Sequence, residues 1–210
     1  MRELLRRLND PDWEDLSDYV VHFTRKTIEN DCAANIESIL LQGSIDARTK
    51  FGVGRYYPGC EKAVCLSEVP ILHLPPVTIR RGVFGIGFTK SFIFQLGGGP
   101  LFYLTGGRYE AIAALMKTAA NDLDAPVWKL VPYIDQGSGA YDFDWEREWR
   151  VPGAIPVTPE NVSFLFLPHS LHEDFRGYLR RKHSEGSMPL FDCPLIDPKW
   201  PKERIRECLR

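Results

Sequence analysis

The most regular alternation of apolar and polar side chains in this chain lies in residues 145–151, which read WEREWRV. A period of two is typical of a strand with one buried face. If Trp149 and Val151 face the core, Glu148 and Arg150 share the opposite face. A strand fixes both side chains with little entropy left to lose, so this face either binds a polar ligand or carries an ordinary cross-strand ion pair.

Shorter patterns of the same kind, separated by helical patterns, fill the rest of the chain. Apolar positions three and four residues apart predict helices over 24–43, which ends at Gly43, over 109–116 and over 172–181. Strand patterns, rich in β-branched and aromatic residues, lie at 18–24, 63–67, 82–89, 101–105, 127–134 and 162–167. This mixture predicts an α+β domain.

Turn residues divide the chain into three expected parts. Residues 1–18 start with a charged helix that stops near Asn9, Asp10 and Pro11, residues 19–185 form a single α+β domain, and residues 186–210 form an irregular tail. A length of 210 residues is enough for one domain with a sizeable core.

Composition narrows the class of protein. An apolar content of 44% and a charged content of 26% are globular values, and a net charge of −2 argues against a protein that grips nucleic acid over its whole surface. No run approaches the roughly 18 apolar residues of a membrane span, and the N-terminus lacks the apolar core of a signal peptide. We therefore expect a soluble, cytoplasmic protein that does not contact a membrane. The cysteines form no CxxC pair, which predicts reduced thiols and no metal site: Cys32, Cys60, Cys65, Cys193 and Cys208.

Two further places carry side chains suited to a ligand. His22 and Thr24 share one face at the end of the first predicted strand, where the histidine either contacts a ligand or serves the structure. Ser67 and Glu68 close the strand CLSE, and the glutamate is either a ligand contact or a surface residue before Pro70. The segment GIGFTK lacks the spacing of a phosphate loop, and no GxSxG, HExxH or GxGxxG motif occurs.

These motifs, in their order along the chain, resemble those of two related groups of proteins. The chain carries HFT followed by a helix ending in ILLQG, then CLSEVP, GIGFTK and EREWRVPGAIPVTPENVSFLFLP. HFT with its helix, and a late glutamate strand followed by a proline-bearing turn, resemble the DarT-like ADP-ribosyltransferases. The abortive-infection AbiGi and DUF2971-type proteins are similar in their HFT start and in the motifs that appear here as CLSEVP, GIGFTK and EREWRV, and the middle motif is nearer to the AbiGi type. The similarity spans residues 19–168 and rests on short motifs.

The resemblance implies an ADP-ribosyltransferase-like fold, in which two small, mostly antiparallel sheets with flanking helices enclose a cleft for NAD, the substrate. It implies that Glu148 is the catalytic carboxylate, which stabilises positive charge on the ribose as the nicotinamide bond breaks. Arg150 or Arg147 would balance charge or hold a phosphate, and Glu146 competes with Glu148 for the catalytic role. The other residues expected to contact NAD are His22, Phe23, Thr24, Tyr56, Tyr57, Ser67, Glu68, Phe88 and Tyr103.

Three functions remain open on this basis. The first is transfer of ADP-ribose from NAD to a macromolecular acceptor, nucleic acid or protein, by a toxin or phage-defence effector. The second is a non-catalytic antitoxin or sensor module on the same fold, which binds a cognate partner protein or a nucleotide. The third, an RNA-phosphate transferase, requires a cluster of basic residues that the sequence does not show.

Overall fold

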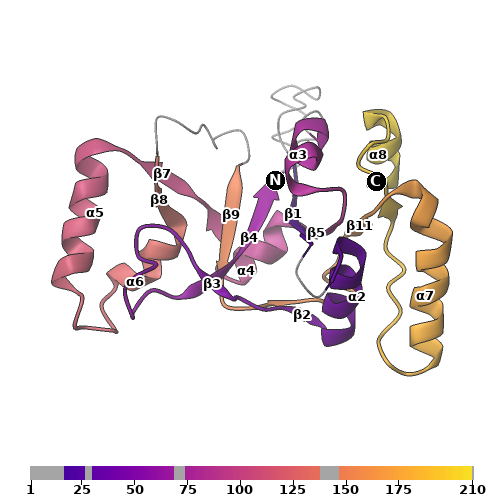
Figure 1. Ribbon diagram of the computed structural model, residues 1–210, viewed down its shortest axis with the longest axis horizontal. Coiled ribbons are helices and arrows are strands. Elements are labelled where there is room, and N and C mark those ends of the chain that lie inside the picture. The colour runs from indigo at the N-terminus through magenta and orange to yellow at the C-terminus, as the bar shows by residue number, and fades with distance from the viewer. Residues whose placement is uncertain (1–16, 27–29, 69–73, 138–146, 210) are drawn as a thin grey trace.

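The fold described here is that of a computed structural model, which describes residues 17–26, 30–68, 74–137 and 147–209 (Figure 1). It confirms an α+β protein with small sheets and flanking helices. The helix predicted within residues 1–18 lies outside the described residues. The helices are α2 (Cys32–Gln42), α3 (Leu74–Arg81), α4 (Lys90–Gln95), α5 (Gly106–Thr118), α6 (Val127–Leu130), α7 (His172–Ser184) and α8 (Lys202–Cys208), with 3-10 turns at Val131–Tyr133 and His169–Leu171.

The described strands form a main, mostly antiparallel sheet and two small ribbons. The strands are β1 (Tyr19–Phe23), β2 (Ser44–Ile45), β3 (Thr49–Lys50), β4 (Lys62–Glu68), β5 (Gly85–Thr89), β6 (Gly99–Pro100), β7 (Phe102–Leu104), β8 (Ile134–Gln136), β9 (Glu148–Pro152), β10 (Ile155–Pro156), β11 (Phe164–Phe166) and β12 (Leu195–Ile196). The order in the main sheet is β12-β11-β5-β1-β4-β9-β6, and β3 also pairs with β4; β11 and β12 run parallel. One ribbon pairs β2 with β10, and the other pairs β7 with β8.

Alternation along the strands buries both faces of the main sheet. On one face Val20, Leu66 and Trp149 pack in a core with residues of α2, α4 and α7. On the other face Val21 and Phe23 pack with residues of α3, α8 and β11. Successive strand side chains point to opposite faces, so β1 contributes Val20 to one core and Val21 and Phe23 to the other.

The main sheet opens between β1 and β4. Strand β1 pairs with β5 along its whole length, from Tyr19 to Phe23, but with β4 only where Val20 faces Glu68 and Val21 faces Ser67. Beyond these two rungs the strands separate. The sheet therefore has an opening beside His22 instead of a continuous ladder of hydrogen bonds.

Two segments differ from their predicted structure. Residues 127–134 were predicted as a strand, which is wrong: they form α6 and a 3-10 turn, and β8 begins only at Ile134. Pro132 cannot donate to a strand ladder but fits the first turn of a helix, which explains the difference. The tail predicted as irregular contains β12 and α8, because Ile196 and Ile205 bury their side chains in the second core.

The first helix is also shorter than predicted. Residues 24–26 are not helical, and α2 begins at Cys32. Asp31 precedes it, and its carboxylate accepts a hydrogen bond of 2.9 Å from the amide of Ala34. An aspartate in this position satisfies one of the unpaired amides of the first turn, which sets the start of the helix at Asp31.

Candidate functional site

A cleft of about 1070 Å³ lies where β1 and β4 separate. Its walls come from β1, α2, the segment around β2 and β3, β4 and β9. This volume lies slightly above the range of roughly 300–1,000 Å³ that is usual for small-molecule sites in proteins. Six of the residues that the sequence singled out line it: His22, Phe23, Thr24, Ser67, Glu148 and Arg150.

Glu148 and Arg150 lie side by side on the cleft face of β9, as the alternation of the strand predicted. Nε of Arg150 donates a hydrogen bond of 2.9 Å to Oε1 of Glu148. Trp149 between them is buried in the core on the opposite face. The carboxylate is therefore fixed both by its strand and by a charge-assisted hydrogen bond to its neighbour.

Arg150 is almost fully buried and is held from three directions. Its guanidinium also donates to Oδ2 of Asp135 at 2.9 Å and to the carbonyl of Pro132 at 3.1 Å. It lies 5.0 Å from the ring of Phe51. Burial opposes the charge, but the charge of Glu148 and the hydrogen bond to Asp135 outweigh it, and the net effect raises the pKa of Arg150 above its usual value. Arg150 is thus a permanent, rigid cation.

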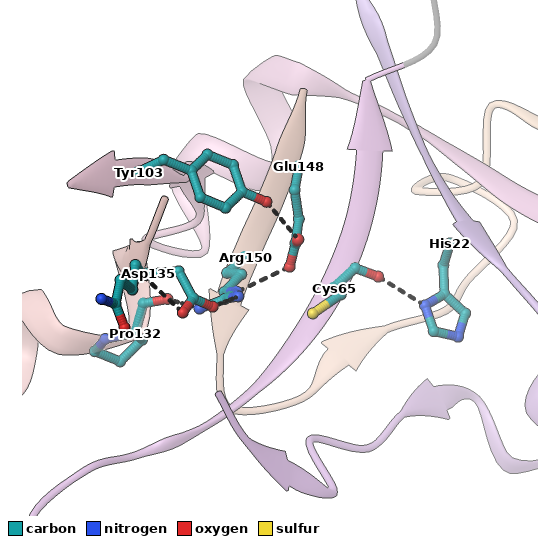
Figure 2. Close-up of polar contacts among 8 residues, drawn as sticks. His22, Cys65, Tyr103, Pro132, Asp135, Glu148 and Arg150 are labelled. Atoms are coloured by element: carbon teal, nitrogen blue, oxygen red, sulfur yellow. Dashed lines mark hydrogen bonds and ion pairs between the residues drawn. The ribbon is translucent and has the colours of Figure 1, made fainter. Parts of the chain in front are cut away.

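Tyr103 approaches the same carboxylate from the β7–β8 ribbon. Its hydroxyl lies 3.4 Å from Oε2 of Glu148, at the long end of a hydrogen bond. Figure 2 shows Tyr103 in contact with one oxygen of the Glu148 carboxylate and Arg150 in contact with the other. Arg150 therefore holds Oε1 by a short hydrogen bond, whereas Tyr103 holds Oε2 only by a long one.

His22 lies across the opening, on β1. Its Nδ1 is 3.0 Å from the carbonyl oxygen of Cys65 (Figure 2). A carbonyl only accepts hydrogen bonds, so Nδ1 carries the proton and Nε2 of the neutral ring is an acceptor. Burial lowers the pKa of His22, and its bond to Cys65 opposes this shift only in part. The neutral ring therefore predominates at neutral pH.

Thr24 and Ser67 add hydroxyl groups to the cleft. The hydroxyl of Thr24 donates to the carbonyl of Cys32 at 2.9 Å, which ties the end of β1 to the start of α2. Ser67 is paired with Val21 on one side and with Glu148 on the other. Ser67 on β4 thus lies between β1, which carries His22, and β9, which carries Glu148.

Five of the residues expected to contact NAD do not line the cleft. Phe88 is fully buried in the core, and Tyr56 is 82% exposed in the loop before β4. Glu68 points to the opposite face of β4, where Trp149 donates to it at 3.1 Å. Tyr103 reaches Glu148 but does not line the cleft. Tyr57 packs on Trp128 in a separate cluster, and Glu146 lies outside the described residues.

Sequence reasoning missed Cys65 and Asp135. Cys65 lies opposite Arg150 and lines the cleft, and burial together with the charge of Glu148 raises the pKa of its thiol. Its position two residues before Ser67 places both on one face of β4, a signal that the sequence does contain. Asp135 gave no such signal, because its contact with Arg150 depends on how the β7–β8 ribbon packs against β9.

The described residues contain no group of histidine, cysteine and acidic side chains that would hold a metal ion. Among them there is also no helix both long and apolar enough to cross a membrane. Comparison with protein-family models, with curated proteins and with solved structures found no match in any of the three. The functional argument therefore rests on the cleft and its residues.

Proposed function

We propose that this protein transfers ADP-ribose from NAD to a macromolecular acceptor, as a toxin or phage-defence effector in the cytoplasm. The observation that carries the proposal is that His22 and Glu148, which come from distant parts of the sequence, line a single cleft with Thr24 and Ser67. A cognate antitoxin that restrains the activity belongs to the same proposal. The acceptor is a protein or a nucleic acid.

The lining of the cleft fits a dinucleotide. Arg25, Arg48 and Arg81 are among its residues, and guanidinium groups bind the oxygens of a diphosphate in a bidentate manner. Asp46 partly offsets this charge, since its carboxylate lies 3.9 Å from the guanidinium of Arg48. Nε2 of His22 is suited to accept a hydrogen bond from a ribose hydroxyl.

Glu148 has the chemistry that the transfer requires. The bond between the ribose C1′ and the nicotinamide nitrogen breaks, the electron pair leaves with nicotinamide, and positive charge develops on the ribose. A carboxylate that accepts a hydrogen bond from the ribose hydroxyl stabilises this charge. A nucleophilic oxygen or nitrogen of the acceptor then bonds to C1′ and releases its proton. Arg150 keeps Oε1 of Glu148 in place, so that Oε2 can face the sugar.

The test compares the wild type with Glu148→Gln, which keeps the size of the side chain and removes its charge. We expect both to bind NAD in calorimetric titrations. Release of nicotinamide, measured by mass spectrometry with nucleic acid, protein or lysate as acceptor, should fall about 100- to 1,000-fold in the variant. Glu160→Gln, which changes an exposed carboxylate outside the cleft lining, is the matched control and should behave as the wild type.

Two outcomes would contradict the proposal. Absence of NAD binding in the wild type would rule out NAD as the substrate. Binding without turnover in any acceptor mixture would favour the alternative, a non-catalytic antitoxin or sensor module that binds a nucleotide or a partner protein.

A further inference from the structure

Behind the cleft, on the opposite face of the main sheet, lies a second polar cluster centred on Glu68. The side chain of Glu68 is only 8% exposed, and Nζ of Lys90 lies 2.6 Å from its Oε1. Nε1 of Trp149 donates to its Oε2 at 3.1 Å, and Nη1 of Arg147 lies 3.5 Å from Oε1. A buried carboxylate is stable only with such partners, so the four side chains form one connected unit.

This cluster holds both sequence neighbours of Glu148. Arg147 and Trp149 are the residues immediately before and after it, and both contact the carboxylate of Glu68. The backbone adds a further link, because the amide of Glu68 donates to the carbonyl of Arg147 at 3.0 Å. The carbonyl of Glu148 itself accepts from the amide of Leu101 at 2.8 Å. The backbone around Glu148 is therefore fixed from the back of the sheet as well as along β9.

The backbone of Arg147 is in an unusual conformation at this point. Its φ is +40°, the only positive φ of a non-glycine residue in the described part of the chain. A side chain makes this region unfavourable, and residues remain there only where their surroundings hold them. The contacts with Glu68 are among those that hold Arg147 here, and the bend lies directly before the carboxylate that faces the cleft.

We propose that Glu68 is a positioning residue for Glu148. Its side chain binds Arg147 and Trp149 on the opposite face of the sheet and thereby fixes the carboxylate of Glu148 in the cleft. The inference rests on the proposed function, since it assigns Glu68 to the same reaction. Glu68 is not among the residues that line the cleft, so in this proposal its carboxylate does not contact NAD. It acts on the reaction only through the placement of Glu148.

A merely stabilising ion pair would have different consequences. Loss of such a pair lowers the stability of the whole fold and changes kcat only through the fraction of folded protein. Loss of a positioning contact lowers kcat in fully folded protein and leaves KM for NAD unchanged, because the reacting groups are misplaced while the binding contacts remain.

The first measurement is therefore steady-state kinetics of nicotinamide release by Glu68→Gln. Glutamine keeps an acceptor for Trp149 but loses the charge that holds Lys90 and Arg147. We expect kcat to fall about ten- to a hundredfold, with KM for NAD and the circular dichroism spectrum unchanged. The matched control is Glu185→Gln, which removes the carboxylate at the C-terminal end of α7. This carboxylate lies 2.7 Å from Nζ of Lys182, and its loss should leave kcat unchanged.

A second measurement does not depend on activity. Amide hydrogen exchange at position 68 and at Leu101 reports the bonds to the carbonyls of Arg147 and Glu148. We expect faster exchange at both amides in Glu68→Gln, whereas the amide of Leu165, which donates to Pro194 at 3.0 Å across the sheet, should exchange as in the wild type. If Glu68→Gln does not fold, Arg147→Gly replaces it, since glycine adopts φ +40° without strain and removes one of the gripped side chains.

The outcomes separate the two proposals. Unchanged exchange at position 68 and Leu101 would overturn the inference whatever the activity, and so would unchanged kcat in an active, folded Glu68→Gln protein. Faster local exchange together with a selective fall in kcat would support it. If the wild type releases no nicotinamide, the proposed function fails, and faster local exchange in the variant still supports the role of Glu68 in fixing Glu148.

Discussion

Replacement of Arg150 by methionine is expected to lower the free energy of unfolding by about 3–6 kcal/mol. Arg150 is 2% exposed, and its guanidinium is shared among Glu148, Asp135 and the carbonyl of Pro132. Methionine fills the space of the aliphatic stem beside Phe51 but donates no hydrogen bond. The change therefore removes one buried cation and leaves its acceptors in place.

The magnitude follows from the exposure of each partner. The side chain of Asp135 is 32% exposed, so solvent screens its interaction and the loss there is less than about 1 kcal/mol. The side chain of Glu148 is 16% exposed. Its carboxylate and the Pro132 carbonyl each lose a hydrogen bond to a charged donor, worth about 1.5–3 kcal/mol apiece. The two lost hydrogen bonds alone give the expected range of about 3–6 kcal/mol, and the loss at Asp135 is small beside it.

Urea denaturation at pH 7, followed by circular dichroism, measures the difference. Arg181→Met is the control, because Arg181 is 62% exposed and lies 3.9 Å from Glu185, and it should change stability by less than about 1 kcal/mol. A loss of less than about 1 kcal/mol in Arg150→Met with a native spectrum would refute the reasoning, since it would mean that Glu148 does not depend on a buried partner.

Two further predictions concern pH and packing. Burial lowers the pKa of His22, so the unfolded chain binds the proton more tightly than the folded protein does. The free energy of unfolding should therefore fall as the pH drops below the ordinary histidine pKa of about 6.5. In urea titrations, His22→Gln should lose less stability between pH 7 and pH 5 than the wild type. A methyl group on Gly87 would overlap the ring of Phe164, so Gly87→Ala should lower stability by about 1–3 kcal/mol. Gly177 lies within α7 with open space around it, so Gly177→Ala should raise stability by about 0.5–1 kcal/mol, and thermal melts of the pair would show shifts of opposite sign.

Much of the sheet could be predicted from the sequence, because it depends on local alternation. The strands predicted around Val20, Leu66 and Trp149 are confirmed as β1, β4 and β9. The phase of β9 is confirmed too, with Glu148 and Arg150 on one face. By the same alternation Ser67 and Glu68, which are adjacent on one strand, cannot both face the same ligand.

The opening between β1 and β4 could not be predicted in this way. It depends on where pairing between two strands stops, and that is a property of non-local contacts. The same holds for Asp135, whose contact with Arg150 requires the β7–β8 ribbon to pack beside β9. The strand predicted over residues 127–134 was wrong for a different reason. A short apolar run has no period of its own, and Pro132 favours a helical turn.

The arrangement of β9 suggests why stability and chemistry are linked in this fold. A shift of one residue in the pairing of β9 with β4 would turn Trp149 and Val151 toward the cleft and Glu148 toward the core. Burial of these two apolar side chains therefore selects the register that presents Glu148. Glu68 adds to this selection, because its bond to Trp149 exists only when the indole faces the core. A variant that weakens the packing of Trp149 should for this reason disturb the carboxylate in the cleft before the fold is lost.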